Sequence, residues 1–193
     1  VGGRENTGST YYSTVVGGIQ NLSLGEKSFI GNGSSNKALH DYSTILNGSD
    51  NIASGNRSFI ANGSSNSATT QSSSVLGGSN NLASGQVSIV NGGSYNIASG
   101  DYSNVGGYRN IASGNYSNVN GGGFNRATNS YSSIAGGNNN QANGKYAFIG
   151  GGNLNTAQTN SSSILGGQSN ITFGNNSSII GGYSISGYSD NTV

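Results

Sequence analysis

The sequence contains no cysteine, methionine, tryptophan or proline. Without cysteine the chain can form neither a disulfide framework nor a thiolate metal site. Only 7 Lys and Arg and 6 Asp and Glu are scattered over 193 residues, so no basic patch suited to a nucleic acid is visible. No apolar run reaches the length of a membrane span. We therefore expect no nucleic-acid partner and no membrane insertion of this segment.

Residue types that carry catalysis or bind metals are sparse. His40 is the single histidine, and the six acidic residues fall in separate parts of the chain. A Ser-His-Asp constellation or a pair of catalytic carboxylates is therefore not expected. Calcium-binding β-roll repeats need an aspartate at each glycine-rich turn, and this chain lacks them. We predict that the protein is not an enzyme and holds no cofactor and no metal.

What the chain has in abundance is one repeat, of which "NIASGDYSNVGG" (residues 96–107) is an example. We number each copy from a serine two residues before Ile or Val; Ala147 replaces this serine in one copy. Position 3 is always Ile or Val, position 6 is Gly, position 9 is Asn in nearly every copy, and position 11 is usually Ala. Low-complexity disorder has no reason to keep such phase. The copies begin at Ser13, Ser28, Ser43, Ser58, Ser73, Ser88, Ser103, Ser117, Ser132, Ala147, Ser162 and Ser177.

A period of about fifteen residues is typical of one coil of a parallel β-solenoid. We expect strands at positions 1–4 and 9–12 and corners at 5–8 and 13–15, where Gly and Asn tolerate positive φ. Alternation then turns positions 1, 3, 9 and 11 inward and positions 2, 4, 10 and 12 outward. In the one copy of fourteen residues, we place the gap at position 4, so that Gly106 and Gly107 fill positions 5 and 6.

The predicted fold is all-β: a single-chain parallel β-solenoid, or β-roll, of about twelve coils. It is one continuous domain over residues 1–193, with 1–12 a partial first coil and 177–193 a degenerate last coil. The rival is an antiparallel sheet of Asn-Gly hairpins. Inward asparagines are expected to pass amide hydrogen bonds to the copies above and below, and inward serines to bond corner backbone. Neither set is then a catalytic or ligand-binding group.

Outward apolar residues suggest contact with another copy of the chain. Positions 4 and 10 are large together in some coils and small or polar together in others, and Phe stands at position 2 in some coils where position 4 is small. Such compensation favours packing against a second surface, and three wedge-shaped copies form the simplest ring. The alternative is ordinary scattered exposure. The candidate interface residues are Val16, Leu22, Phe29, Leu46, Ile52, Phe59, Leu76, Leu82, Ile97, Phe148, Leu165 and Ile171.

A run of tyrosines precedes position 1 in successive coils and provides the candidate ligand-facing residues. Amphipathic rings stacked on a corner can bind sugars or another protein, or they can only shield the corner backbone. The four residues are Tyr102, Tyr116, Tyr131 and Tyr146.

The pattern Asn-x-Ala-x-Gly-x-x-Ser-x-Val-x-Gly at residues 96–107 resembles the head repeats of trimeric autotransporter adhesins, and related repeats in bacterial surface proteins and viral or phage fibres. The resemblance covers essentially the whole chain. It implies a left-handed parallel β-roll and three chains side by side in a homotrimer. It also implies an extracellular place on a cell or virion surface, and attachment to a host surface, matrix or glycan receptor.

Two other functions fit the same repeat. One is a self-assembling extracellular filament subunit, because residues 1–3 continue the repeat in phase and open solenoid ends invite pairing. The other is a β-roll ice-binding protein, because residues 117–121, Ser-Asn-Val-Asn-Gly, are similar to plant-type ice-binding coils. Ice binding would call for a regular Ser or Thr lattice, which positions 2 and 12 do not supply.

Overall fold

The computed structural model describes residues 2–188, and these contain β-strands but no helix. The chain divides into two compact units, Val1–Tyr95 and Asn96–Val193, and each is described by itself. The first unit contains β1 (Thr7–Gly8), β2 (Thr14–Val15), β3 (Leu22–Ser23), β4 (Phe29–Ile30), β5 (Lys37–Ala38), β6 (Thr44–Ile45), β7 (Ile52–Ala53), β8 (Phe59–Ile60), β9 (Ser67–Ala68), β10 (Ser74–Val75), β11 (Leu82–Ala83) and β12 (Ile89–Val90). The second contains β13 (Ile97–Ala98), β14 (Asn104–Val105), β15 (Ile111–Ala112), β16 (Asn118–Val119), β17 (Arg126–Ala127), β18 (Ser133–Ile134), β19 (Gln141–Ala142), β20 (Phe148–Ile149), β21 (Thr156–Ala157), β22 (Ser163–Ile164), β23 (Ile171–Thr172), β24 (Ser178–Ile179) and β25 (Ser186–Gly187).

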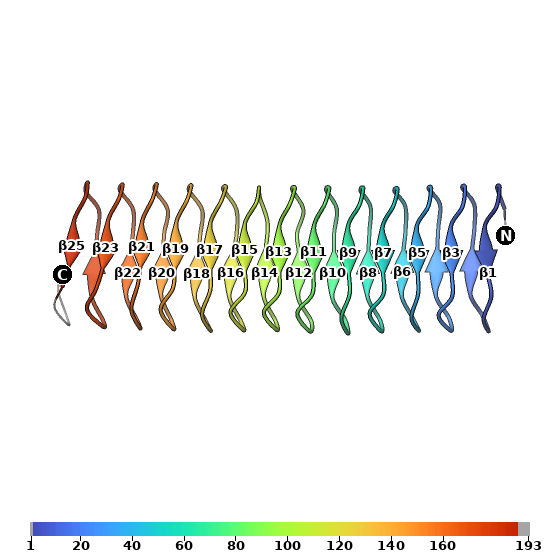
Figure 1. Cartoon of the computed structure of the whole chain (residues 1–193), viewed down its shortest axis with the longest axis horizontal. Coiled ribbons are helices and arrows are strands. Elements are labelled where there is room, and N and C mark those ends of the chain that lie inside the picture. The colour runs from blue at the N-terminus through green and yellow to red at the C-terminus, as the bar shows by residue number, and fades with distance from the viewer. Residues whose placement is uncertain (1, 189–193) are drawn as a thin grey trace. The chain divides into compact units, whose positions relative to one another are not determined.

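Each unit is a parallel β-solenoid. Within a unit the odd-numbered strands form one sheet and the even-numbered strands form another, and neighbouring strands follow chain order (Figure 1). Leu22 pairs with Lys37 and Phe29 with Thr44, fifteen residues on and in parallel. Residues 2–188 hold about twelve such coils. The parallel register confirms the predicted fold class and excludes the antiparallel hairpins. The single continuous domain remains a prediction, and residues 189–193 of the predicted last coil lie outside the described residues.

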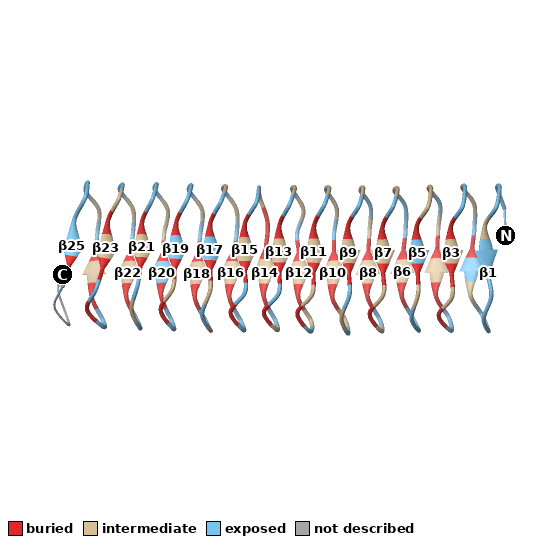
Figure 2. Ribbon diagram, in the orientation of Figure 1, coloured by how far each residue is buried: buried red, intermediate tan, exposed pale blue. Residues whose placement is uncertain are grey.

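The repeated residues form the interior, as predicted. In most strands the first residue is exposed or half-buried and the second is buried (Figure 2). Phe29, half-buried, and Ile30, buried, are an example. Buried Asn, Ser and Ala residues at positions 9, 1 and 11 complete the core. The buried Ile and Val residues at position 3 are Val15, Ile30, Ile45, Ile60, Val75, Val90, Val105, Val119, Ile134, Ile149, Ile164 and Ile179.

The inward asparagines connect each coil to the next one. In Asn125, Oδ1 accepts the backbone N–H of Asn140 at 3.0 Å, while Nδ2 donates to the carbonyls of Gly121 at 3.0 Å and Gly137 at 2.9 Å. Direct amide-to-amide hydrogen bonds join asparagines in the first coils. The expected stacking is thus present, but most of the amide hydrogen bonds in the ladder go to backbone groups. Because these amides are satisfied internally, they are structural groups.

The inward serines fall into two groups. In most coils the hydroxyl donates to the carbonyl three residues earlier, as Ser132 does to Asn129 at 2.6 Å. Four buried hydroxyls have no hydrogen-bond partner among the described residues, namely those of Ser58, Ser88, Ser103 and Ser117. The expectation that these serines bond corner backbone therefore holds for part of the set only. Ala147 occupies the same place, 1% exposed, so the hydroxyl is not needed for packing.

Glycine at position 6 is required by the geometry of the first corner. Gly33 has φ of 110°, and a Cβ there would lie 2.0 Å from the carbonyl oxygen of Gly48 in the next coil. The prediction of positive φ at position 5 is wrong for most coils. Gly92 has φ of 139°, but Gly136 and Gly151 do not have positive φ, and a Cβ on either would meet nothing within 4 Å.

Positions 8 and 15 adopt the left-handed conformation in residues other than glycine. At position 15, Lys27, Tyr42 and Val87 have φ of 56°, 58° and 56°. This conformation costs about 1–2 kcal/mol for an L-residue. It also turns the N–H back toward the preceding coil, where Tyr42 donates to the carbonyl of Glu26 at 2.9 Å. The next residue is thereby aimed inward, and it is Ser or Asn in every described coil except at Ala147 and Ile185.

The fourteen-residue coil compresses two positions into one residue. The N–H of Gly106 donates to the carbonyl of Val119 at 3.0 Å, the bond that position 4 makes elsewhere. Its carbonyl accepts Nδ2 of Asn110 at 2.6 Å, the bond that position 5 accepts elsewhere. The gap expected at position 4 is therefore shared between positions 4 and 5. Gly107 keeps position 6, with φ of 98°.

Candidate functional site

The four predicted ligand-facing tyrosines form a regular column in the second unit. Ring centroids are 4.9 Å apart for Tyr102–Tyr116, 5.0 Å for Tyr116–Tyr131 and 5.0 Å for Tyr131–Tyr146. The first two pairs are tilted by 1° and the third by 16°. About half of each residue is exposed. We call this set, Tyr102, Tyr116, Tyr131 and Tyr146, the tyrosine column.

Parallel backbone register positions the column. All four residues occupy position 15, and their φ values of 56–61° give them one common direction from the corner. The N–H of Tyr131 donates to the carbonyl of Asn115 in the preceding coil at 2.9 Å. Because each ring face lies against the next ring, ring edges and hydroxyls form the exposed surface. The sequence left open that a sugar could stack on the ring faces. Between neighbouring rings of the column this mode is blocked.

The same position in the first unit mixes cations with tyrosine. Lys27 Nζ and the Arg57 guanidinium lie 5.1 Å and 5.6 Å from the ring centroid of Tyr42, on the coils before and after it. Lys27 also donates to the Tyr42 hydroxyl at 3.1 Å and pairs with Glu26 at 3.2 Å. The hydrogen bond to Tyr42, followed by the contact with Glu26, raises the pKa of Lys27 above its ordinary value. Cation–π contacts thus replace ring stacking here.

The predicted interface residues divide by exposure. Val16, Leu46, Leu76 and Leu165 at position 4 are 59%, 45%, 48% and 54% exposed, and Phe148 at position 2 is also exposed. The remaining members are half-buried, namely Leu22, Phe29, Ile52, Phe59, Leu82, Ile97 and Ile171.

Part of the size compensation arises within the chain. A Cβ on Gly31 would lie 3.5 Å from Cε1 of Phe29, so this ring covers the small residue two places on. In the first unit, position 4 alternates large and small over successive coils: Val16, Gly31, Leu46, Ala61 and Leu76. The repeat of this face therefore spans two coils. Comparing each position along the column, rather than each coil by itself, could have found this alternation.

Sequence reasoning missed an aromatic cluster at the other corner of the second unit. The rings of Tyr108 and Phe124 meet edge to face at 5.4 Å. The guanidinium of Arg109 lies 5.4 Å from the Tyr108 centroid and 5.7 Å from that of Phe124. The signal was present in the sequence, because Tyr108 and Arg109 fill positions 7 and 8 of one coil and Phe124 fills position 8 of the next.

Other polar groups form no site within the described residues. His40 lies exposed in the second corner, where its carbonyl accepts the hydroxyl of Ser43 at 2.5 Å. Over residues 2–188, no three His, Cys, Asp or Glu side chains come together in a way that could hold a metal ion. The same stretch has no helix long and apolar enough to span a bilayer.

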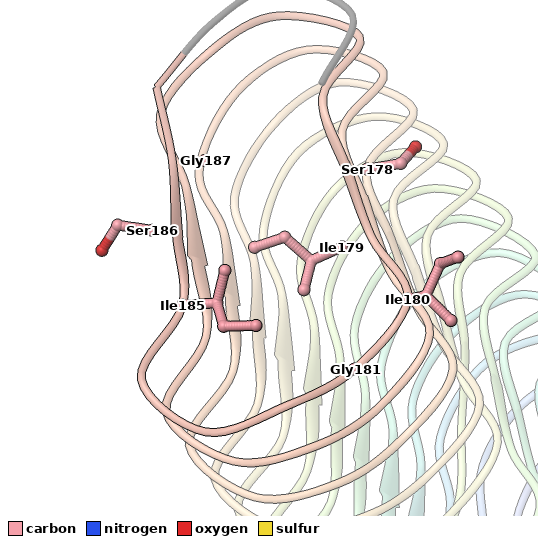
Figure 3. A pocket seen from close by; sticks show the side chains of 7 residues that line it. All are labelled: Ser178, Ile179, Ile180, Gly181, Ile185, Ser186 and Gly187. Carbon is pink, nitrogen blue, oxygen red and sulfur yellow. The ribbon is translucent and has the colours of Figure 1, made fainter. Parts of the chain in front are cut away.

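One cavity of about 290 Å³ lies at the last described coil. Figure 3 shows Ile179 and Ile185 pointing toward its centre, while Ser178, Ile180 and Ser186 point away. The cavity is thus an extension of the apolar interior. Its lining of Ser, Ile and Gly carries no titratable side chain.

No protein-family model matches the chain. A search of curated proteins also finds no match.

Proposed function

We propose that the chain is a non-enzymatic structural and adhesive segment of an extracellular fibre. The observation that carries the proposal is the tyrosine column, four half-exposed rings held in register on successive coils. Side chains with an apolar body and a polar tip are well suited to contacts at a wet interface. The interior of the coils is filled by the repeated residues, which leaves the outward positions free to vary.

We further propose that three copies associate side by side through positions 4 and 10. Support comes from Val16, Leu46, Leu76 and Leu165, each about half exposed along one column within its unit. Apolar residues repeated along a surface favour contact with another protein. A heterologous contact between the two flanks of the glycine corner can close into a ring.

The oligomer is tested by measuring molecular mass by light scattering at 1 to 100 µM protein. A constant trimer mass is expected, and the double variant Leu46→Ser, Leu76→Ser should fall to a monomer. The matched control is Ile19→Ser, which alters an exposed residue at position 7 and should remain a trimer. A wild-type monomer would refute the trimer, whereas a mass that grows with concentration would favour the filament.

Adhesion is tested separately with beads that carry the purified chain. The beads should attach to cell layers, extracellular matrix or glycan-coated surfaces more than albumin-coated beads do. Attachment to none of these surfaces would contradict the adhesive role, whatever the oligomeric state.

A serine column in the first unit supports ice binding as a second candidate. Position 7 is serine in five successive coils, with Oγ atoms 3.3 Å apart for Ser49–Ser64 and 3.0 Å for Ser79–Ser94. A regular row of hydroxyls could order water. Thermal hysteresis in a monomeric sample would support this candidate, and its absence would remove it.

A further inference from the structure

We propose that the tyrosine column binds an extended, uncharged β-1,4-linked polysaccharide, with one sugar ring lying over each coil. This inference rests on the proposed adhesive function and specifies the class of ligand. It follows from three features of the column: the groups that remain accessible, their spacing and the charge around them.

Hydroxyls and ring edges are the accessible groups. The faces within the column are paired at 4.9–5.0 Å between centroids, and Lys145 Nζ lies 5.0 Å from the centroid of the last ring, Tyr146. No hydrogen bond to another described residue engages the four tyrosine hydroxyls. The column therefore offers one free donor and acceptor per coil, all directed away from the same corner.

The spacing of the rings, 4.9–5.0 Å between centroids, selects among linear polymers. Side chains on one face of an extended peptide repeat at about 6.8 Å, so a peptide would slip by about 5 Å relative to the column over three intervals. In an extended β-1,4-linked glycan, each pyranose ring advances by close to the length of one coil, and equatorial hydroxyls run along its edges. Such a chain places one sugar ring at each tyrosine of the column, and because successive rings are turned over, the same ring edge meets every second tyrosine.

Ligands that insert between aromatic rings are excluded by the stacking. Proline-rich helices dock between aromatic side chains, and nucleic-acid bases stack on them. A centroid spacing of 5.0 Å leaves no room for a proline or a base between neighbouring rings. A sugar that lies across the ring edges needs no such gap.

The surroundings are polar and nearly neutral. Position 14, just before each tyrosine, carries Asp101 at one end of the column and Lys145 at the other, with the uncharged Asn115 and Ser130 between them. Asn118 on β16 is half-buried and its Oδ1 is fully buried, so it adds no charge and no accessible acceptor to this surface. Amide and hydroxyl groups can bond sugar hydroxyls, while one acid and one base give no net attraction for a sulfated or uronic-acid chain.

The first experiment measures the affinity of the folded chain for cellobiose, cellotetraose and cellohexaose by calorimetry. Because the column has four rings, affinity should rise by at least tenfold from the disaccharide to the tetrasaccharide and then change by less than threefold. Depletion by microcrystalline cellulose or chitin should exceed depletion by amylose or gelatin beads. No binding of the wild-type chain to any β-1,4-glycan would overturn the inference, as would a preference for gelatin.

The second experiment separates the hydroxyls from the rings. The variant Tyr116→Phe, Tyr131→Phe keeps the stacked rings, so its melting temperature should stay within about 2 °C of wild type while its cellotetraose affinity falls at least tenfold. The control Tyr11→Phe, Tyr12→Phe removes two exposed hydroxyls in the first unit and should bind as wild type does. Unchanged binding by the first variant would overturn the role of the hydroxyls.

The bead-adhesion assay distinguishes failure of the glycan inference from failure of the proposed adhesive function. If the chain binds no glycan but its beads still attach to cells or matrix, the glycan inference is wrong and the adhesive function stands. If the beads attach to no surface, the adhesive function itself is contradicted.

Discussion

Replacing one inward asparagine tests how the coils are held together. Asn125 is fully buried, and Asn125→Ala deletes its three side-chain hydrogen bonds at once. The N–H of Asn140 loses its acceptor inside the solenoid, which costs about 1–3 kcal/mol. The carbonyls of Gly121 and Gly137 keep other donors, so each lost bond there costs about 0.5–1.5 kcal/mol. The expected destabilisation is about 2–6 kcal/mol.

The isosteric change Asn125→Asp gives this prediction a distinct pH dependence. An aspartate retains the acceptor for the N–H of Asn140 but places its second oxygen against two carbonyl oxygens. Burial and this repulsion raise the pKa of the carboxyl in the folded state above the unfolded value of about 3.9. The folded variant then binds more protons than the unfolded chain, so its stability rises as the pH falls from 7 toward 4.

Urea unfolding, followed by far-ultraviolet circular dichroism at pH 7 and pH 4, measures both effects. The control is Asn138→Ala, which changes an exposed asparagine in the following corner and should alter stability by less than about 0.5 kcal/mol. If Asn125→Ala cost no more than this control, or if Asn125→Asp showed the wild-type pH profile, the asparagine ladder would not stabilise the coils.

The remaining predictions concern single positions, and each is measured by the same unfolding assay. Ser117→Ala should stabilise the fold by about 1–3 kcal/mol, because the buried hydroxyl it removes has no partner. Ser132→Ala should destabilise the fold by about 0.5–1.5 kcal/mol, because it loses a hydrogen bond. If both variants changed the free energy of unfolding in the same direction, this account would be contradicted. Gly137 has φ of 88°, and a Cβ there would lie 2.3 Å from a carbonyl oxygen, whereas a Cβ on the neighbouring Gly136 would meet nothing within 4 Å. Gly137→Ala should therefore lower the free energy of unfolding several times more than Gly136→Ala. Similar losses of stability would argue against the corner geometry. Val87→Asn should stabilise by about 1 kcal/mol because a β-branched residue there has φ of 56°, and a loss of stability would be inconsistent with left-handed strain.

The interior was predictable because inward residues must recur in every coil. Ile30 and Ile45 are buried at the same position, and Asn21 and Asn36 stack as their period requires. A parallel fold follows from this phase, since identical neighbours lie over one another only when strands run in the same direction. The column of Tyr116 and its neighbours was predicted from the same phase, because residues at one position of successive coils lie over one another.

What the sequence did not predict depends on backbone conformation that side chains do not signal. Lys27 and Val87 are poor left-handed residues, yet the coil geometry places both at positive φ. The glycines at position 5, such as Gly136, are not required by their own φ or by space. The face-to-face pairing of Tyr116 with Tyr131 depends on ring orientation, which periodicity does not specify.

Nuclear Overhauser contacts between backbone protons of isotope-labelled protein test the central claim most directly. The stacked-coil fold predicts contacts in which both residue numbers rise together, joining Asn118 with Ser133, Val119 with Ile134, and Ser133 with Phe148. Contacts in which one number rises as the other falls would show antiparallel strands and contradict the account.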